Sequence, residues 1–108
     1  MGITRHPVID AYFAAESDAD IGSVDSLFAT DASVTDEGAT IVGIDAITAW
    51  KQAAKKKYRY TAEPLESEES DTRSVMQVRL AGNFPGSPVT VTYTFILRDE
   101  MITALEIE

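Results

Sequence analysis

The sequence predicts an α+β protein in which helices come first and a mostly antiparallel sheet follows. Apolar residues recur at helical spacing in segments that end near Lys57. From Tyr58 onward, apolar and polar residues alternate, as they do in strands that bury one face. Because the long strands all follow the helices, we expect three N-terminal helices packed on one face of a curved sheet.

The three predicted helices are marked by their first residues and by their apolar spacing. The first is expected at Thr4–Ser17, with Pro7 in its first turn, where proline is well tolerated. The second is expected at Asp20–Phe28, where the aspartate is a favourable N-cap residue. Gly43 separates the third helix from a preceding strand, and this helix is expected to end near Lys57.

Two short strands are predicted between the second and third helices. Asp31 is expected to begin a turn out of the second helix. The first strand then carries Val34 and Asp36 on one face, since side chains two residues apart in a strand share a face. Glu37–Gly38 is expected to form a turn, and Thr40–Val42 the second strand.

Asp36 is the strongest candidate for chemistry, because a core-facing Val34 places this carboxylate on an apolar side. A carboxylate in such a place is costly unless it is hydrogen-bonded or lines a functional cavity. The alternative interpretation is a turn acid that opens the reversal at Glu37–Gly38, which is a common use of aspartate.

The second half of the chain is predicted to form the long strands. Tyr58–Glu66 is extended, and Pro64 indicates an edge strand or a bulge. The acidic run Glu66–Asp71 is expected to be a polar loop, and Gly82–Pro88 a turn. Clear alternation of apolar and polar residues predicts three further strands, Arg73–Ala81, Val89–Leu97 and Met101–Ile107.

The polar face of these strands also carries apolar residues, namely Ile96, Ile102 and Ala104. Apolar side chains on the outer face of a sheet suit contact with another subunit. We therefore expect a homodimer that forms through the sheet.

Length, composition and charge indicate one globular domain over residues 1–108. Hydrophobic residues make up 44% of the chain and charged residues 25%, as in ordinary globular proteins. No apolar run approaches the roughly 20 residues of a membrane span, and no signal peptide is visible, so we expect a cytoplasmic location and no membrane association. The net charge of −9 disfavours nucleic acid and fits a neutral or apolar ligand.

The absence of cysteine excludes disulfides, thiolate metal sites and a cysteine nucleophile. His6 is the single histidine, so neither a histidine-based triad nor a histidine metal cluster can be built. We expect no metal and no cofactor.

One stretch resembles a known family. Leu27-Phe28-x-x-Asp31-Ala32-x-Val34-x-Asp36, followed by Gly43-Ile44-x-Ala46-Ile47-x-x-Trp50, is similar to the SnoaL-like branch of the nuclear transport factor 2-like superfamily. That superfamily also contains ketosteroid isomerase, polyketide cyclases and epoxide hydrolases. The resemblance extends over nearly the whole chain and implies a cone-shaped fold with an apolar pocket.

The resemblance to ketosteroid isomerase implies roles for particular residues. It places that family's general base on Asp36 and its oxyanion-donating tyrosine on Tyr12. The family's protonated aspartic acid falls on or near Tyr93, which is a departure in residue type but still a hydroxyl donor. Further hydroxyls and apolar walls for a small apolar ligand are expected from Phe13, Trp50, Tyr58, Tyr60 and Phe95.

These roles imply a cofactor-free isomerase or lyase, because moving a proton next to a carbonyl needs a base at carbon and donors at oxygen. The carboxylate of Asp36 is equally suited to activating water, as in the epoxide hydrolases. Polyketide cyclases of the superfamily carry acid and base groups on later strands, where this chain has no matching aspartate or histidine. Two alternatives to an enzyme are a non-catalytic binding module and a homodimeric interaction module.

Overall fold

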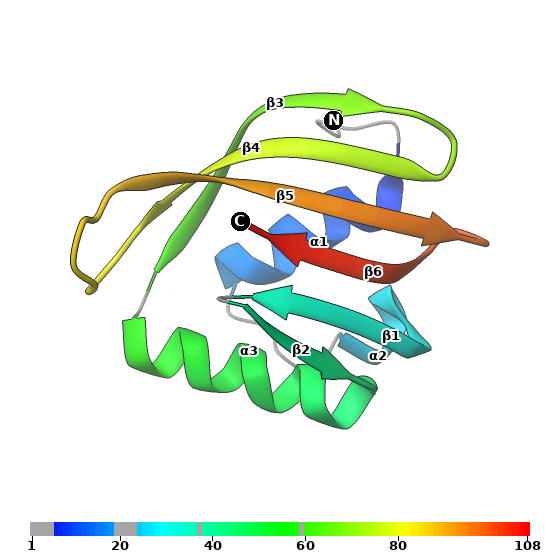
Figure 1. Cartoon of the computed structure of the whole chain (residues 1–108), viewed down its shortest axis with the longest axis horizontal. Helices are drawn as coiled ribbons and strands as arrows, with labels where there is room; N and C mark the ends of the chain where they lie inside the picture. The colour runs from blue at the N-terminus through cyan, green and yellow to red at the C-terminus, as the bar shows by residue number, and fades with distance from the viewer. Residues whose placement is uncertain (1–5, 19–23, 37, 59) are drawn as a thin grey trace.

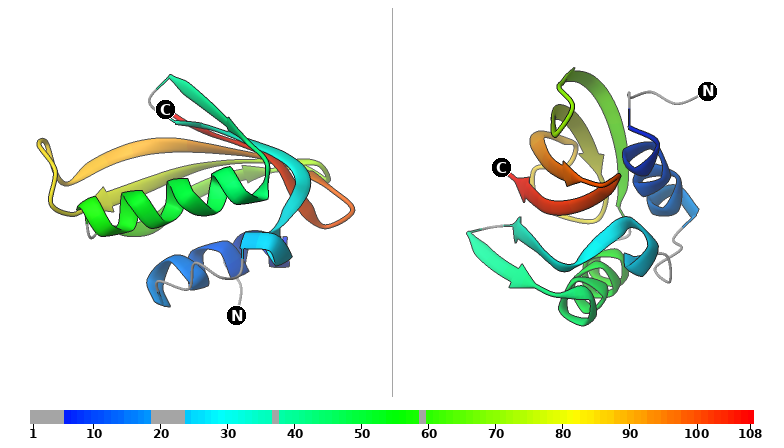
Figure 2. Two further views of the ribbon diagram at one scale, coloured as in Figure 1. Left: turned by 90° about the horizontal axis from the view of Figure 1, so that it is seen from below. Right: turned by 90° about the vertical axis from the view of Figure 1, so that its right-hand side faces the viewer.

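The computed structural model describes residues 6–18, 24–36, 38–58 and 60–108. Six strands form one sheet in the order β2-β1-β6-β5-β4-β3, and helices lie on its concave side (Figures 1 and 2). None of the described helices is long and apolar enough to cross a membrane. The elements in chain order are α1 Pro7–Asp18, α2 Val24–Leu27, β1 Phe28–Asp36, β2 Ala39–Val42, α3 Ile44–Tyr58, β3 Thr61–Glu69, β4 Arg73–Ala81, β5 Val89–Arg98 and β6 Met101–Ile107.

The sheet is antiparallel except where β6, the last strand in the sequence, pairs in parallel with β1. This placement of β6 joins the two halves of the chain, because it lies between β1 and the β3–β5 meander (Figure 1). The predicted α+β class, with helices on a curved and mostly antiparallel sheet, is therefore confirmed.

The core lies between the concave face of the sheet and the helices. Helix α1 begins at Pro7, the residue expected in its first turn, while the predicted start at Thr4 lies outside the described residues. The buried residues come from all three helices and four strands, and the largest fully buried side chains include Tyr12, Phe28, Tyr93, Phe95, Ile9, Ile47 and Met76. Apolar spacing in the helices and alternation in the strands both converge on this one cluster.

The second helix ends one residue earlier than predicted, while its predicted start at Asp20 lies outside the described residues. It ends at Leu27, and Phe28 already begins β1, so the expected helix through Phe28 and the expected turn at Asp31 are both wrong. The physical reason is pairing: Phe28 lies opposite Ile102 of β6, and strand pairing overrides the helix-like spacing of the apolar residues. A register shift between Phe28 and Ser33 accommodates the irregular start of the strand.

Strand β3 lies three residues later in the chain than predicted: it spans Thr61–Glu69 instead of Tyr58–Glu66, and Tyr58 is still the last residue of α3. The acidic run that was expected to be a loop continues the strand to Glu69, and its residues pair with β4. Because β3 is an edge strand, its acidic side chains face solvent, and charge on an edge protects the strand from pairing with other chains. The prediction of an edge or bulge at Pro64 is confirmed, since the register shifts between Pro64 and Glu66.

The hairpin between β5 and β6 explains why one residue that was predicted on the polar face of the sheet lies in the core. Asp99 and Glu100 both have positive φ, and a register shift between Ile96 and Leu97 pairs Leu97 with Ile102. Ile102 is therefore 0% exposed and belongs to the core, so its predicted place on the polar face is wrong. Ile96 remains on the outer face and is 38% exposed.

Candidate functional site

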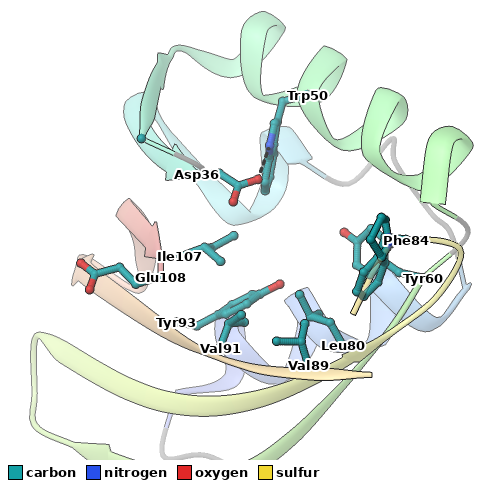
Figure 3. Close-up of a pocket in the computed structure, with 12 residues that line it drawn as sticks. Asp36, Trp50, Tyr60, Leu80, Phe84, Val89, Val91, Tyr93, Ile107 and Glu108 are labelled. Atoms are coloured by element: carbon teal, nitrogen blue, oxygen red, sulfur yellow. Dashed lines mark hydrogen bonds between the residues drawn. The ribbon is translucent and has the colours of Figure 1, made fainter. Parts of the chain in front are cut away.

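A cavity of about 510 Å³ opens between the concave face of the sheet and α3, which contributes Trp50 to its lining. This volume lies within the range of small-molecule sites, roughly 300–1,000 Å³. Its apolar wall comes mainly from β4, β5 and the end of β6, with Leu80, Val89, Val91 and Ile107 (Figure 3). The curvature of the sheet is what separates these strands from α3 and leaves the space between them.

Asp36 provides a carboxylate at one end of the cavity. It is the last residue of β1, and it is half-buried while Val34, two residues earlier, is fully buried. The predicted sharing of one strand face by these two residues agrees with this placement, because Val34 joins the core and Asp36 lines the cavity.

Trp50 orients that carboxylate. Its indole Nε1–H donates a hydrogen bond of 3.1 Å to Oδ2 of Asp36, across from α3 to β1 (Figure 3). Gly43, with a φ of 95°, makes the turn from β2 into α3, and its carbonyl accepts the first helical bond, from Ile47 N. The helix therefore starts at a fixed point and presents Trp50 to Asp36. A hydrogen bond to a carboxylate is stronger than one between neutral groups, so this contact holds both side chains in place.

Two tyrosines also line the cavity, as predicted for Tyr60 and Tyr93. Tyr93 is buried on the concave face of β5, and its hydroxyl points into the space between the two ends of the cavity (Figure 3). Tyr60 lies beside Phe84 at the end opposite Asp36 and Trp50 (Figure 3). Tyr58 is the last residue of α3, and its side chain lies outside the described residues.

Tyr12 lies deeper than expected. It is 0% exposed, its hydroxyl accepts a hydrogen bond of 3.3 Å from Lys51 Nζ, and it is not among the described residues that line the cavity. Its ring packs edge-on against Phe13 and Phe95, with ring centroids 5.2 and 5.5 Å away. Of the two residues expected to line one pocket, Asp36 is among the described lining residues and Tyr12 is not.

Phe13 and Phe95 were also expected as cavity walls, and the structure places both in the core. Neither is among the described lining residues. The reason is that α1 packs directly against β5, where Phe13, Phe95 and Tyr93 form a continuous aromatic cluster. Of this cluster, Tyr93 alone is among the described lining residues. Its hydroxyl, unlike that of Tyr12, is therefore positioned to meet a ligand in the cavity.

Comparison with known proteins identifies the family. The family model described as SnoaL-like domain matches residues 9–104, which is most of the chain. The chain belongs to the SnoaL-like domain family. No curated protein sequence matches it.

Solved structures share the fold of this SnoaL-like domain. A crystal structure from Sinorhizobium meliloti, described as a candidate polyketide cyclase, is 44% identical with a TM-score of 0.91, and the alignment covers 94% of each chain. A ketosteroid isomerase-like protein from Catenulispora acidiphila, solved with trimethylamine, is 21% identical with a TM-score of 0.81, covering 94% of this chain and 83% of that one. A candidate isomerase of the SnoaL-like family from Agrobacterium tumefaciens is 19% identical with a TM-score of 0.75, covering 94% and 92%. At 21% and 19% identity, the last two structures show only that their fold is the same as that of this chain.

Sequence reasoning missed several residues of this SnoaL-like domain that shape the site. Phe84 and Pro85 come from the turn between β4 and β5, which was expected only to be a turn. Lys51 was missed although a signal existed. It follows Ile47 by four residues, so it lies on the apolar stripe of α3, where a lysine is unusual.

Glu106, an exposed residue of β6 two positions before Glu108, gives a pH-dependent prediction. A hydrogen bond with Glu108 and the negative charge of that neighbour raise the pKa of Glu106, and Arg73 opposes this effect. The folded protein thus holds this proton more tightly than the unfolded chain. Stability from this pair is fully present below the ordinary glutamate pKa of 4.5 and is lost as pH rises through the raised pKa.

We therefore expect Glu106→Gln to raise the free energy of unfolding at neutral pH, with the gain disappearing below pH 4.5. Urea unfolding at the two pH values measures the difference. Glu68→Gln, which removes the same charge from an exposed position on β3, is the control. An equal effect from both substitutions at both pH values contradicts the coupling of Glu106 to Glu108.

Proposed function

We propose that this domain binds a small, largely apolar carbonyl compound in its cavity and that Asp36 acts on it as a general base. The observation that supports this most strongly is the Trp50–Asp36 hydrogen bond of 3.1 Å at the end of an otherwise mostly apolar cavity. A carboxylate that is held in place beside an apolar binding space has the geometry that a proton-abstracting base requires. The association of this fold with isomerase and polyketide cyclase activity is consistent with such chemistry.

The proposed step moves one proton. Asp36 takes the proton from the carbon next to the ligand carbonyl, and the electron pair of that C–H bond moves to the carbonyl oxygen as an enolate. The hydroxyls of Tyr93 and Tyr60, both lining the cavity, are the candidate donors to that oxygen. Return of the proton to another carbon completes an isomerisation, and loss of a leaving group completes a lyase reaction.

The relative from Sinorhizobium meliloti suggests a third outcome of the same step, because an enolate can also close a ring on a second carbonyl group. The described lining residues of β4, β5 and β6 contain no aspartate or histidine, and Asp36 is the proposed base for a cyclase as well. Isomerase, lyase and cyclase therefore share the same first step and differ in the substrate.

A non-catalytic binding module is the second candidate function. The observation that favours it is the burial of Tyr12, because the donor expected opposite Asp36 is held by Lys51 outside the described lining of the cavity. Ligand binding without turnover requires only the apolar wall and one oriented polar group.

A thermal-shift screen with hydrophobic ketones, on the wild type and on Asp36→Asn, tests both candidates. A ligand that binds only the folded state raises the melting temperature in both proteins. Product formed by the wild type alone supports the enzyme, and binding to both proteins without product supports the module. No binding to either protein removes both proposals.

We also propose that two chains pair through the convex face of the sheet. Ile96 and its cross-strand neighbour Ala104 place apolar surface there, with Ile96 38% exposed. Sedimentation at low micromolar concentration is expected to show a dimer, and Ile96→Glu is expected to give a monomer, because a charge at the interface would lose its water. A monomeric wild type contradicts this proposal.

A further inference from the structure

Lys51 is a buried lysine directly behind the cavity wall. It follows Trp50 in α3 and is only 3% exposed. Its Nζ lies 3.3 Å from the Tyr12 hydroxyl and 4.3 Å from the centroid of the Tyr12 ring. Lysine is among the residue types least often buried, because removing an ammonium group from water is costly.

An aromatic side chain of the cavity wall lies next to the Lys51 ammonium group. Nζ of Lys51 lies 5.5 Å from the ring centroid of Trp50, and Trp50 in turn donates its indole hydrogen bond to Asp36. Lys51 itself is not among the described lining residues, whereas Trp50 and Asp36 are. Charges in a poorly solvated interior interact more strongly than charges in water, and Trp50 is the side chain that links this lysine to the Asp36 end of the cavity.

The lining alone would favour a cationic ligand. It includes two acids, Asp36 and Glu108, and among the described lining residues there is no lysine, arginine or histidine. It also presents the aromatic side chains of Trp50, Tyr60 and Tyr93, and aromatic faces attract ammonium groups. A protonated amine beside Asp36 would therefore be the expected ligand if no other charge were near.

We propose that Lys51 sets the charge preference of the cavity, so that it accepts a neutral oxygen-bearing ligand and disfavours a protonated amine. The buried cation offsets the carboxylate of Asp36 and supports negative charge that develops on a ligand oxygen. This proposal rests on the proposed function and narrows its substrate class to neutral carbonyl compounds. Lys51 is a specificity-determining residue in this role, since it acts across Trp50.

The test compares three probes of one shape on the wild type and Lys51→Met. The probes are naphthylmethylamine, which is cationic, naphthylmethanol, which is neutral, and naphthoate, which is anionic. Trp50 is the single tryptophan of the chain, so its indole N–H resonance reports binding at this wall without overlap. Methionine keeps the unbranched length of lysine and removes its charge.

The wild type is expected to bind naphthylmethanol more tightly than naphthylmethylamine. Lys51→Met is expected to bind the amine about tenfold more tightly than the wild type and naphthoate more weakly by a similar factor. The affinity for naphthylmethanol should be nearly unchanged, because only the local charge is altered. Arg98→Met, which removes an exposed positive charge from the far end of β5, is expected to leave the order of the three probes as in the wild type.

Three outcomes overturn the proposal. The first is a wild type that prefers the amine, which needs no variant to observe. The second is an unchanged order of probes in Lys51→Met, or in Lys51→Gln if the methionine variant does not fold. The third is the same change of probe affinities in Arg98→Met as in Lys51→Met, which would show that the effect comes from the net charge of the protein and not from the position of Lys51. Failure of all three probes to bind the wild type contradicts the proposed function itself, which separates the two claims.

Discussion

Asp36→Asn is expected to lower turnover by roughly 10²- to 10⁴-fold while the ligand still binds, because this is the usual contribution of a positioned general base. Asparagine has nearly the same shape as aspartate, and its amide oxygen can accept the hydrogen bond from Trp50 Nε1, which is 3.1 Å from Oδ2 in the wild type. It cannot take up a proton from carbon at neutral pH. The wall of the cavity is thus kept and only the base is removed.

Exchange of carbon-bound hydrogen for deuterium measures this step without a known substrate. β-Tetralone is an apolar ketone whose acidic C–H groups lie next to its carbonyl, and NMR in deuterium oxide follows their loss. Asp31→Asn is the matched control, since Asp31 is an exposed aspartate on the same strand. Equal exchange in wild type and Asp36→Asn, with bound ketone, would show that Asp36 is no base and would favour the binding module.

Phe95→Ala is expected to lower the free energy of unfolding by about 3–5 kcal/mol, the usual cost of removing a buried phenylalanine side chain. Phe95 is 0% exposed, and its ring lies within 5.5 to 6.1 Å of those of Tyr12, Phe13 and Tyr93, measured between centroids. A domain of this size has a total stability of only about 5–15 kcal/mol. Urea unfolding should therefore show a large loss or a protein that is partly unfolded in buffer.

Phe84→Ala is the matched control for that substitution, because it removes the same side chain from the cavity wall instead of the core. Phe84 is only half-buried, so a smaller loss of stability is expected, together with weaker ligand binding. Phe95→Ala should therefore mainly lower the stability of the fold, and Phe84→Ala should mainly weaken the binding of the ligand. A larger stability loss for Phe84→Ala than for Phe95→Ala contradicts the division between aromatic core and cavity.

The elements that were predicted well are those whose pattern is local. Strands β4 and β6 have the predicted bounds, because alternation along each strand already separates its buried and exposed faces. The errors are at places where a partner decides the structure. Phe28 joins a strand because Ile102 lies opposite it, and the acidic run up to Glu69 stays extended because β4 pairs with it. Ile102 is far from Phe28 in the sequence, and β4 is the next strand of the same hairpin, but in both places the pairing and not the local pattern decides the structure.

The residues of the site also fall into those that the local pattern predicted and those that depend on tertiary packing. Alternation from Val34 was enough to place Asp36 on the apolar side of its strand, and Trp50 was expected as an apolar wall of the pocket, whereas its hydrogen bond to Asp36 was not predicted. The depth of α1 was not predictable from spacing. It depends on how Tyr12 packs against β5 and on the hydrogen bond from Lys51, a residue 39 positions away. Residues that meet only through tertiary packing, Lys51 among them, had to come from the structure.

Titration of the Trp50 indole N–H resonance with β-tetralone tests the central claim most directly, because this group both lines the cavity and bonds to Asp36. A ligand in the cavity is expected to shift the resonance in a saturable way in the wild type and in Asp36→Asn, and Phe84→Ala should weaken the binding. A resonance that stays in place up to the solubility limit, for this ketone and for the naphthyl probes, would contradict a binding cavity at Asp36 and Trp50.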